Sequence, residues 1–383
     1  MRAPWSPRNK VLHVGAPNLA PWGEFAGLAR GCFERRWLTN RGPLVEQLEA
    51  ELGQRLGVEH VILCSNGTVA LELAARAAGL SGEVILPSFT FVATAHALQW
   101  QGIRPVFADV DPITYNMDPA AVEALITPAT SAIVGVHLYG RPCAISALQE
   151  IADRHGLPLL FDAAHAFGCA ADGQAIGGHG LCEVFSFHAT KVFNTGEGGA
   201  IATNNGAFAN QVRLLQNFGF AAEDRVVALG LNGKMNELSA ALGLANLRHL
   251  PRFIDTNRRH FELYNQGLAN VDGLQLIDYS GQTISNYHYV IVEVDNSRFG
   301  CNRDRLRDHL LTHGVLARRY FTPGCHRQPP YNGTPISHAL PHTEWLSERL
   351  LALPNGTQLD AADVRRICTQ IRSCPRDGIN LHA

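Results

Sequence analysis

One lysine stands out in the segment FSFHATKVFNTGEGGA (residues 185–200), where it follows an apolar run and precedes a glycine-rich turn. Only three of the 32 Lys and Arg residues are lysines, namely Lys10, Lys191 and Lys234. Arginine keeps its proton under ordinary conditions, whereas a lysine amine can lose its proton and attack a carbonyl carbon. The preference for arginine can equally reflect the base composition of the source genome. It still leaves only three candidates for an imine-forming amine, of which Lys191 is the strongest.

Other polar and aromatic residues follow predicted strands. Asp162 comes directly after the apolar run LPLLF, and His165 follows three residues later. The turn SNGT (65–68) leads into a predicted helix, whose N-terminus offers backbone N–H groups to a phosphate. Ser186 lies in the predicted strand before Lys191, and Phe91 follows another strand. Each feature also has a structural explanation, since Asp162 and the turn can serve as caps and Phe91 can belong to the core.

Taken together, these residues match the needs of one cofactor. Pyridoxal phosphate uses an amine for its aldehyde, an acid for its pyridinium nitrogen, a face for stacking and donors for its phosphate. Because the carboxyl ends of parallel strands meet at one edge of a sheet, Lys191, Asp162, Phe91 and the turn at 65–68 would converge there. The residue pattern therefore favours pyridoxal phosphate.

The elements that must position these residues alternate between short apolar runs and helical patterns. This alternation predicts an α/β protein with a large, seven-stranded, mostly parallel sheet and a smaller C-terminal α+β domain. We place the large domain at residues 1–249 and the small domain at 250–383, because a charged helical pattern begins after Pro251. The predicted strands are HVILC (60–64), EVIL (83–86), RPVFA (104–108), SAIVGV (131–136), LPLLF (157–161), EVFSF (183–187) and GGAIAT (198–203).

Composition excludes several classes of function. The net charge is −2, so there is no sign of the basic face that a nucleic-acid-binding protein presents. The sequence has no apolar stretch long enough to span a membrane, and its first residues lack the apolar core of a signal peptide. Nine cysteines without a CxxC pair indicate reduced thiols, no metal site and a cytoplasmic location.

The motifs resemble those of the DegT/DnrJ/EryC1/StrS sugar aminotransferase family, which consists of fold-type I pyridoxal-phosphate enzymes. The resemblance covers nearly the whole chain, and it includes the 29-residue interval between Asp162 and Lys191. The matching segments are WLTNRGP, SNGTVAL, PSFTFVAT, DVDPITYNMDP, VHLYGRP, FDAAHAFG, FSFHATKVFNTGEGGA, LNGKMNEL, RRYFTPGCH and LALP.

The resemblance implies roles for the residues around the cofactor ring. Lys191 would hold pyridoxal 5'-phosphate (PLP) as a Schiff base and would later carry the proton. Asp162 would pair with the pyridine nitrogen, His165 would touch the phenolic oxygen, and Phe91 would stack on the ring.

The resemblance also implies a phosphate site that two subunits share. Gly67, Thr68 and Ser186 would bind the phosphate, and Asn232 of a neighbouring subunit would complete the site, which implies a homodimer. The family usually has arginine where this chain has Lys234, and this departure puts any bidentate carboxylate contact there in doubt.

The implied reaction is a ping-pong transfer of the amino group of L-glutamate to a nucleotide-linked keto sugar, and we expect C4 of a dTDP-4-keto-6-deoxyhexose to be the acceptor. Asn40 and His326 resemble positions that line the sugar site, although both can equally shape loops. Alternatives are a C3-keto sugar, a keto-cyclitol or an aromatic precursor as acceptor, and sugar dehydration, although relatives that dehydrate carry histidine in place of Lys191. A non-catalytic regulator that binds PLP is the alternative of a different class.

Overall fold

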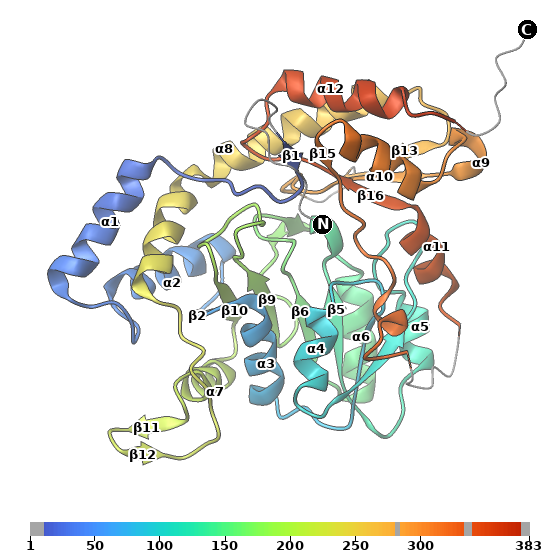
Figure 1. Cartoon of the computed structure of the whole chain (residues 1–383). Helices are drawn as coiled ribbons and strands as arrows, with labels where there is room; N and C mark the ends of the chain where they lie inside the picture. Colours follow the sequence, from blue (N-terminus) through green and yellow to red (C-terminus); the bar gives the residue numbers. More distant parts are fainter. Residues whose placement is uncertain (1–10, 280–283, 333–338, 377–383) are drawn as a thin grey trace, which may run out of the picture.

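The computed structural model describes residues 11–279, 284–332 and 339–376. Its centre is a seven-stranded sheet with the order β2-β10-β9-β6-β5-β3-β4 (Figure 1). Only β10 runs antiparallel to its neighbours. The prediction of a seven-stranded, mostly parallel sheet is therefore confirmed. The strands are β2 (His60–Cys64), β3 (Glu83–Pro87), β4 (Arg104–Ala108), β5 (Thr130–Val136), β6 (Leu159–Asp162), β9 (Cys182–Ser186) and β10 (Gly199–Thr203).

Helices cover both faces of this sheet, which explains why its strands are apolar along their whole length. In β2, Ile62 and Cys64 face one cluster of buried side chains, whereas Val61 and Leu63 face another. The first face is covered by α3 (Gly67–Ala77), α4 (Ala93–Gln99) and α7 (Gly206–Gln216). The second face is covered by α2 (Pro43–Leu56), α5 (Pro119–Ala124), α6 (Ile145–His155) and the first half of α8 (Glu237–Leu268).

The sheet order brings the chemically interesting strand ends together. Because β10 is antiparallel to both β2 and β9, these two strands run parallel to β6 and end at the same edge. Asp162 is the last residue of β6, Ser186 is the last residue of β9, and α3 begins shortly after β2. This edge faces the C-terminal elements of the chain (Figure 1).

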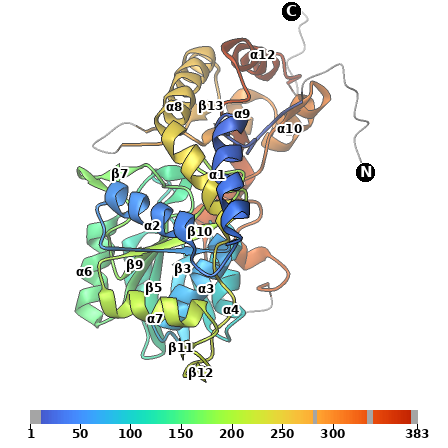
Figure 2. The same ribbon diagram turned by 90° about the vertical axis from the view of Figure 1, so that its left-hand side faces the viewer.

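The C-terminal elements form a second layer with its own buried core (Figure 2). A three-stranded antiparallel sheet, β13-β14-β16, lies against helices and the second half of α8. The chain start joins this region, since β1 (Leu12–His13) pairs with β15 (Val315–Leu316). The remaining elements here are β13 (Leu274–Leu276), β14 (Val290–Val294), α9 (Asn296–Phe299), α10 (Arg303–Thr312), the 3₁₀ helix η2 (Cys325–Arg327), α11 (Pro341–Arg349), β16 (Leu350–Leu353) and α12 (Ala361–Arg372).

The sequence predicts a new helix after Pro251, and this detail is wrong. A single helix, α8, runs from Glu237 to Leu268 with Pro251 inside it. Leu250 and Phe253 are both buried on either side of the proline, so packing holds the helix together although Pro251 donates no hydrogen bond. The division of the chain at residue 250 stays a prediction, and α8 crosses that position.

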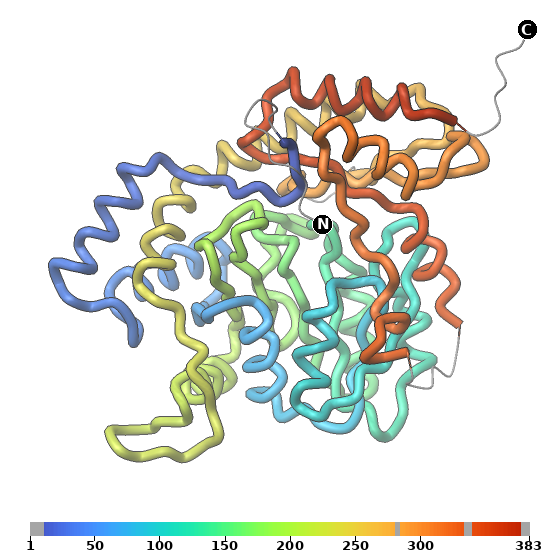
Figure 3. The backbone as a smooth tube through the Cα atoms, viewed as in Figure 1, coloured from blue at the N-terminus to red at the C-terminus, as the bar shows by residue number. Residues whose placement is uncertain are grey.

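Two elements extend from the body of the molecule. Helix α1 (Trp22–Arg35) packs on α8. The hairpin β11 (Phe220–Ala222)–β12 (Arg225–Val226) lies next to α7 and projects from the body of the molecule as an arm (Figure 3). The apolar side chains of the arm are exposed, with Leu229 at 80%. No helix in the described ranges is long and apolar enough to cross a membrane. The smallest elements are η1 (Leu138–Gly140), β7 (Ala170–Ala171) and β8 (Gln174–Ala175).

Candidate active site

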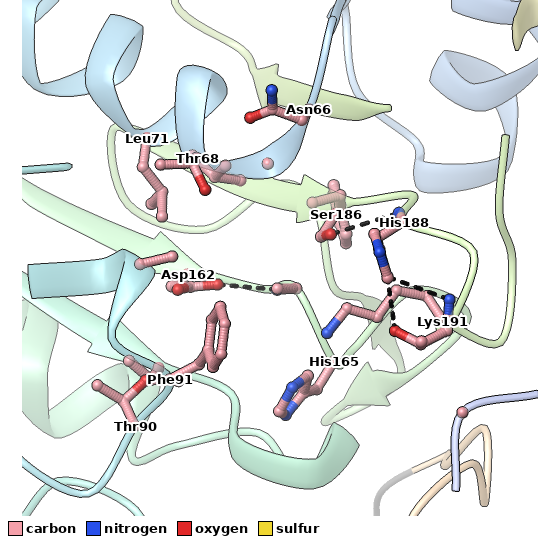
Figure 4. A pocket seen from close by; sticks show the side chains of 18 of the residues that line it. Asn66, Thr68, Leu71, Thr90, Phe91, Asp162, His165, Ser186, His188 and Lys191 are labelled. Atoms are coloured by element: carbon pink, nitrogen blue, oxygen red, sulfur yellow. Dashed lines mark hydrogen bonds between the residues drawn. The ribbon is translucent and has the colours of Figure 1, made fainter. Parts of the chain in front are cut away.

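A cavity of about 600 Å³ lies at the carboxyl edge of the large sheet. The cavity brings together seven of the ten predicted site residues, and Figure 4 shows several of them around one common space. They come from β6 and the loop after it, β9 and the loop after it, the N-terminus of α3 and the loop after β3. These seven are Gly67, Thr68, Phe91, Asp162, His165, Ser186 and Lys191.

Lys191 enters the cavity from the loop between β9 and β10. Its backbone N–H donates to the carbonyl oxygen of His188, which closes a tight turn directly after β9. The Nζ atom lies 3.3 Å from the hydroxyl oxygen of Tyr289. Burial lowers the pKa of Lys191 to about 8, and the charge of Asp162 limits this shift. A large fraction of the amine is therefore neutral near pH 8 and able to act as a nucleophile or a base.

The carboxylate of Asp162 is held in place by two hydrogen bonds. The backbone N–H of Ala164 donates to Oδ1 at 3.0 Å, and Thr94 Oγ1 donates to Oδ2 at 2.7 Å. The hydroxyl oxygen of Thr94 also lies 3.0 Å from that of Thr90, so Thr90 belongs to the same hydrogen-bond network. Asp162 is only 6% exposed, and it lines the cavity from the side opposite Lys191 (Figure 4).

The ring of His165 is fixed as a neutral imidazole. The backbone N–H of Tyr139 donates to Nδ1 at 3.2 Å, so the ring proton resides on Nε2. Burial, together with the charge of Lys191, lowers the pKa of His165 well below its usual value. The ring packs against Tyr289 with a distance of 4.3 Å between the centroids. His165 can thus offer one N–H donor to a ligand oxygen.

The N-terminus of α3 forms a cradle beside β9. The side chain of Asn66 caps the helix by accepting from the N–H of Val69, and the first two residues of the helix, Gly67 and Thr68, line the cavity. A Cβ atom at Gly67 would lie 2.9 Å from the Cβ of Ser186. Only glycine therefore leaves room between the helix and Ser186. Ser186 and Thr68 both line the cavity on this side.

Three predicted site residues lie elsewhere. Asn40 is exposed, and Asn232 is exposed at the base of the hairpin arm. His326 is buried, with Nδ1 2.6 Å from Ser88 Oγ and Nε2 3.4 Å from Glu344. None of the three lines the cavity within the described part of the chain, and their predicted contacts with ligands stay predictions.

Of the other two lysines, only Lys234 lies in the described residues, and it does not line the cavity. Lys234 donates to Asn217 near the arm, and Lys10 lies outside the described residues.

Sequence reasoning missed two residues that touch the reactive groups. Thr94 follows Thr90 by four residues in the segment PSFTFVAT, and this pair of hydroxyls close to a predicted strand end was a usable signal. Tyr289 lies about 100 positions after Lys191, in a run that indicates only a strand. No local pattern links Tyr289 to Lys191, because the C-terminal layer brings it there.

The chemistry of the cavity fits pyridoxal phosphate. A partly neutral amine, a fixed carboxylate and a neutral imidazole donor face one space, and the glycine-lined helix terminus offers donors to a phosphate. Phe91 lines the cavity with an aromatic ring, and the residue is 55% exposed.

Comparisons with known proteins agree with this chemistry. The sequence profile of the DegT/DnrJ/EryC1/StrS aminotransferase family, a family of PLP-dependent enzymes, matches residues 23–372. A dTDP-4-amino-4,6-dideoxy-D-glucose transaminase of Shigella dysenteriae is 39% identical over 95% of this chain and 99% of its own length. A GDP-perosamine synthase of Caulobacter vibrioides is 34% identical over 93% of this chain and 96% of its own. The crystal structure of DesI in the presence of its TDP-sugar product superposes with a TM-score of 0.93 and 47% identity, covering 96% of this chain and 93% of that one.

Proposed function

The chain belongs to the DegT/DnrJ/EryC1/StrS aminotransferase family, and we propose that it transfers the amino group of L-glutamate to C4 of a dTDP-4-keto-6-deoxyhexose. The observation that carries this proposal is the buried amine of Lys191, which shares one cavity with Asp162 and His165. Amino transfer needs an amine that loses its proton near neutral pH, and burial provides one here.

We assign the cofactor contacts to the residues that line the cavity. Lys191 would bind the aldehyde of PLP as a Schiff base, and Asp162 would hold the pyridine nitrogen in its protonated form. His165 would donate Nε2–H to the phenolic oxygen, and Phe91 would cover one face of the ring. When bound, PLP supplies an aldehyde for exchange with amines and a ring that accepts electrons. The phosphate would lie against Gly67, Thr68 and Ser186.

The side chains of this protein then carry out the proton transfers. A neutral Nζ of Lys191 can accept the proton from the α-carbon of L-glutamate. In the second half of the exchange, the protonated Nζ can donate a proton to the sugar carbon that receives the nitrogen. Thr94 supports both halves because its hydroxyl holds Asp162 in a fixed position. General acid–base catalysis of this kind contributes roughly 10²- to 10⁴-fold to a rate.

The choice of acceptor is supported by the relatives. The name of the Shigella dysenteriae protein specifies nitrogen at C4 of a dTDP-linked 4,6-dideoxyglucose. DesI, whose structure includes a TDP-sugar product, shares 47% identity with this chain. The proposed site of action is the cytoplasm, since all nine cysteines are buried free thiols.

We propose further that the active form is a homodimer in which Asn232 reaches the site of the partner. Asn232 is exposed and does not line the cavity of its own chain. The neighbouring arm exposes a set of apolar side chains, which a second subunit would cover. These are Phe218, Phe220, Val226, Val227 and Leu229.

The decisive experiment follows the visible absorbance of the PLP-loaded protein. We expect L-glutamate to bleach the band, and subsequent addition of dTDP-4-keto-6-deoxy-D-glucose to restore it. Lys191→Ala should show neither change, and Lys191→Arg, which keeps the charge but cannot form an imine, should behave in the same way. NMR of the product should place the nitrogen at C4. Nitrogen at C3 would refute the assigned position, and a band that glutamate leaves unchanged would refute the assigned donor.

A further inference from the structure

The amine of Lys191 lies beside the hydroxyl of Tyr289. Among the described residues, its only hydrogen-bond partner is the hydroxyl of Tyr289, at 3.3 Å. Likewise, Lys191 is the only hydrogen-bond partner of the Tyr289 side chain among the described residues. Both side chains line the cavity; Tyr289 is 6% exposed, and Lys191 is half-buried. The contact with Tyr289 restricts where the amine can point.

The position of Tyr289 is itself fixed from several sides. Its carbonyl oxygen accepts a hydrogen bond of 2.7 Å from the hydroxyl of Tyr279. Its ring lies 4.3 Å from His165 and 5.0 Å from His288, measured between centroids. The residue directly precedes β14, so the C-terminal sheet anchors its backbone. Tyr289 thus offers a rigid acceptor next to a flexible lysine.

The direction of the hydrogen bond determines what the amine can do. A neutral amine has two N–H donors and one lone pair, and the lone pair must be free to take a proton or attack a carbonyl. Burial raises the pKa of Tyr289 well above its usual value, so its hydroxyl stays neutral. In the contact with Tyr289, Nζ is the donor and the hydroxyl oxygen is the acceptor, so the lone pair that appears when the amine loses another proton is left for the cavity.

We propose that Tyr289 is a positioning residue for the reaction: its hydroxyl oxygen accepts an N–H of Lys191 Nζ and holds the amine with its lone pair directed into the cavity. This inference rests on the proposed function, because it assigns the hydroxyl to the step in which free Lys191 carries a proton. Tyr289 acts through Lys191, and it needs no contact with either substrate.

The first test uses the protein without cofactor and measures no turnover. Trace acetylation with acetic anhydride between pH 6 and 10, followed by mass spectrometry of the Lys191 peptide, reports the pH at which the amine becomes neutral. The wild type should show a midpoint near pH 8, the value to which burial lowers the pKa of Lys191. Tyr289→Phe should shift the midpoint to lower pH, because the ammonium form loses its one acceptor while burial remains.

The second test uses the PLP-loaded protein in a stopped-flow experiment with L-glutamate. Tyr289→Phe keeps the ring and removes only the hydroxyl, so we expect the bleaching rate to fall by about 10- to 100-fold. The apparent affinity for glutamate should change far less than the rate, since the hydroxyl positions the amine and not the donor.

Tyr264→Phe is the matched control. Tyr264 is also fully buried, and its hydroxyl donates to the carbonyl of Pro354 at 2.9 Å, away from the cavity. This variant should lose stability but keep the wild-type midpoint and bleaching rate.

The outcomes separate this inference from the proposed function. If Tyr289→Phe keeps the wild-type midpoint and bleaches within twofold of the wild-type rate, the inference is wrong and the proposed function stands. If the wild type itself does not respond to glutamate, the proposed function is wrong, and the positioning role falls with it even if the acetylation midpoint shifts.

Discussion

Replacing Asn246 by alanine tests how the loop that carries Lys191 is held. Asn246 lies on α8 and is fully buried. Its Nδ2 donates to the carbonyl of Asn194 at 2.8 Å, and its Oδ1 accepts from the N–H of Ala20 at 2.8 Å. Asn194 lies three residues after Lys191, so one side chain ties the loop both to α8 and to the N-terminal segment.

The size of the effect follows from the two hydrogen bonds. Each bond that is removed with a buried partner left behind costs about 1–3 kcal/mol. Asn246→Ala breaks both bonds and leaves a backbone carbonyl and a backbone amide without partners. We therefore expect the free energy of unfolding to fall by about 4 kcal/mol. Urea unfolding of the cofactor-free protein, followed by tryptophan fluorescence, measures this change.

Asn257→Ala is the control, because Asn257 is a second fully buried asparagine on the same helix. Its Nδ2 donates to the carbonyl of Asn286 at 3.2 Å, but its Oδ1 has no hydrogen-bond partner in the described structure. The same side-chain volume is lost, yet only one bond is broken and an unpaired oxygen is removed. We expect a loss of about 1–2 kcal/mol. Equal losses for the two variants would refute the reasoning, since hydrogen bonds would then not distinguish the two sites.

Three further predictions concern the cofactor, the subunit contact and pH. Thr94→Val removes the donor to Asp162 without changing the shape of the side chain, so the dissociation constant of PLP should rise by about 10- to 100-fold in an equilibrium titration; an unchanged constant would show that the hydroxyl does not support the carboxylate. Lys191→Ala and Asn232→Ala should each be inactive alone but regain activity when unfolded and refolded together, because mixed dimers contain one complete site; failure of the mixture while both variants remain dimeric would contradict the shared site. Burial lowers the pKa of His288 to about 4, so between pH 6.5 and 4 the unfolded chain takes up a proton that the folded protein does not. Stability should therefore be lost as the pH falls, by about 2 kcal/mol at pH 5 from this residue alone, and a His288→Gln variant with an equally steep loss in urea unfolding would argue against that origin.

Much of the fold could be predicted because it depends on local patterns. Apolar runs of four to six residues, separated by segments with helical spacing, predict a sheet that is covered on both faces, and the structure contains all seven strands. Asp162 directly follows such a run, and Lys191 lies four positions after the end of another; both were recognised because strand ends of a parallel sheet share one edge. The boundary at Pro251 was wrong for a physical reason: proline weakens a helix locally, but buried neighbours on both sides keep α8 continuous.

The sequence by itself determined the identity of the reactive groups and the elements that carry them. The tertiary structure decided which of these groups meet and in what state. Tyr289 contacts Lys191 only because the C-terminal sheet packs over the edge of the large sheet. The lowered pKa of Lys191 and the single tautomer of His165 likewise depend on burial and on hydrogen bonds from distant segments. Spacing along the chain can place an amine beside a strand, but the pKa of that amine is set by all the groups that surround it in space.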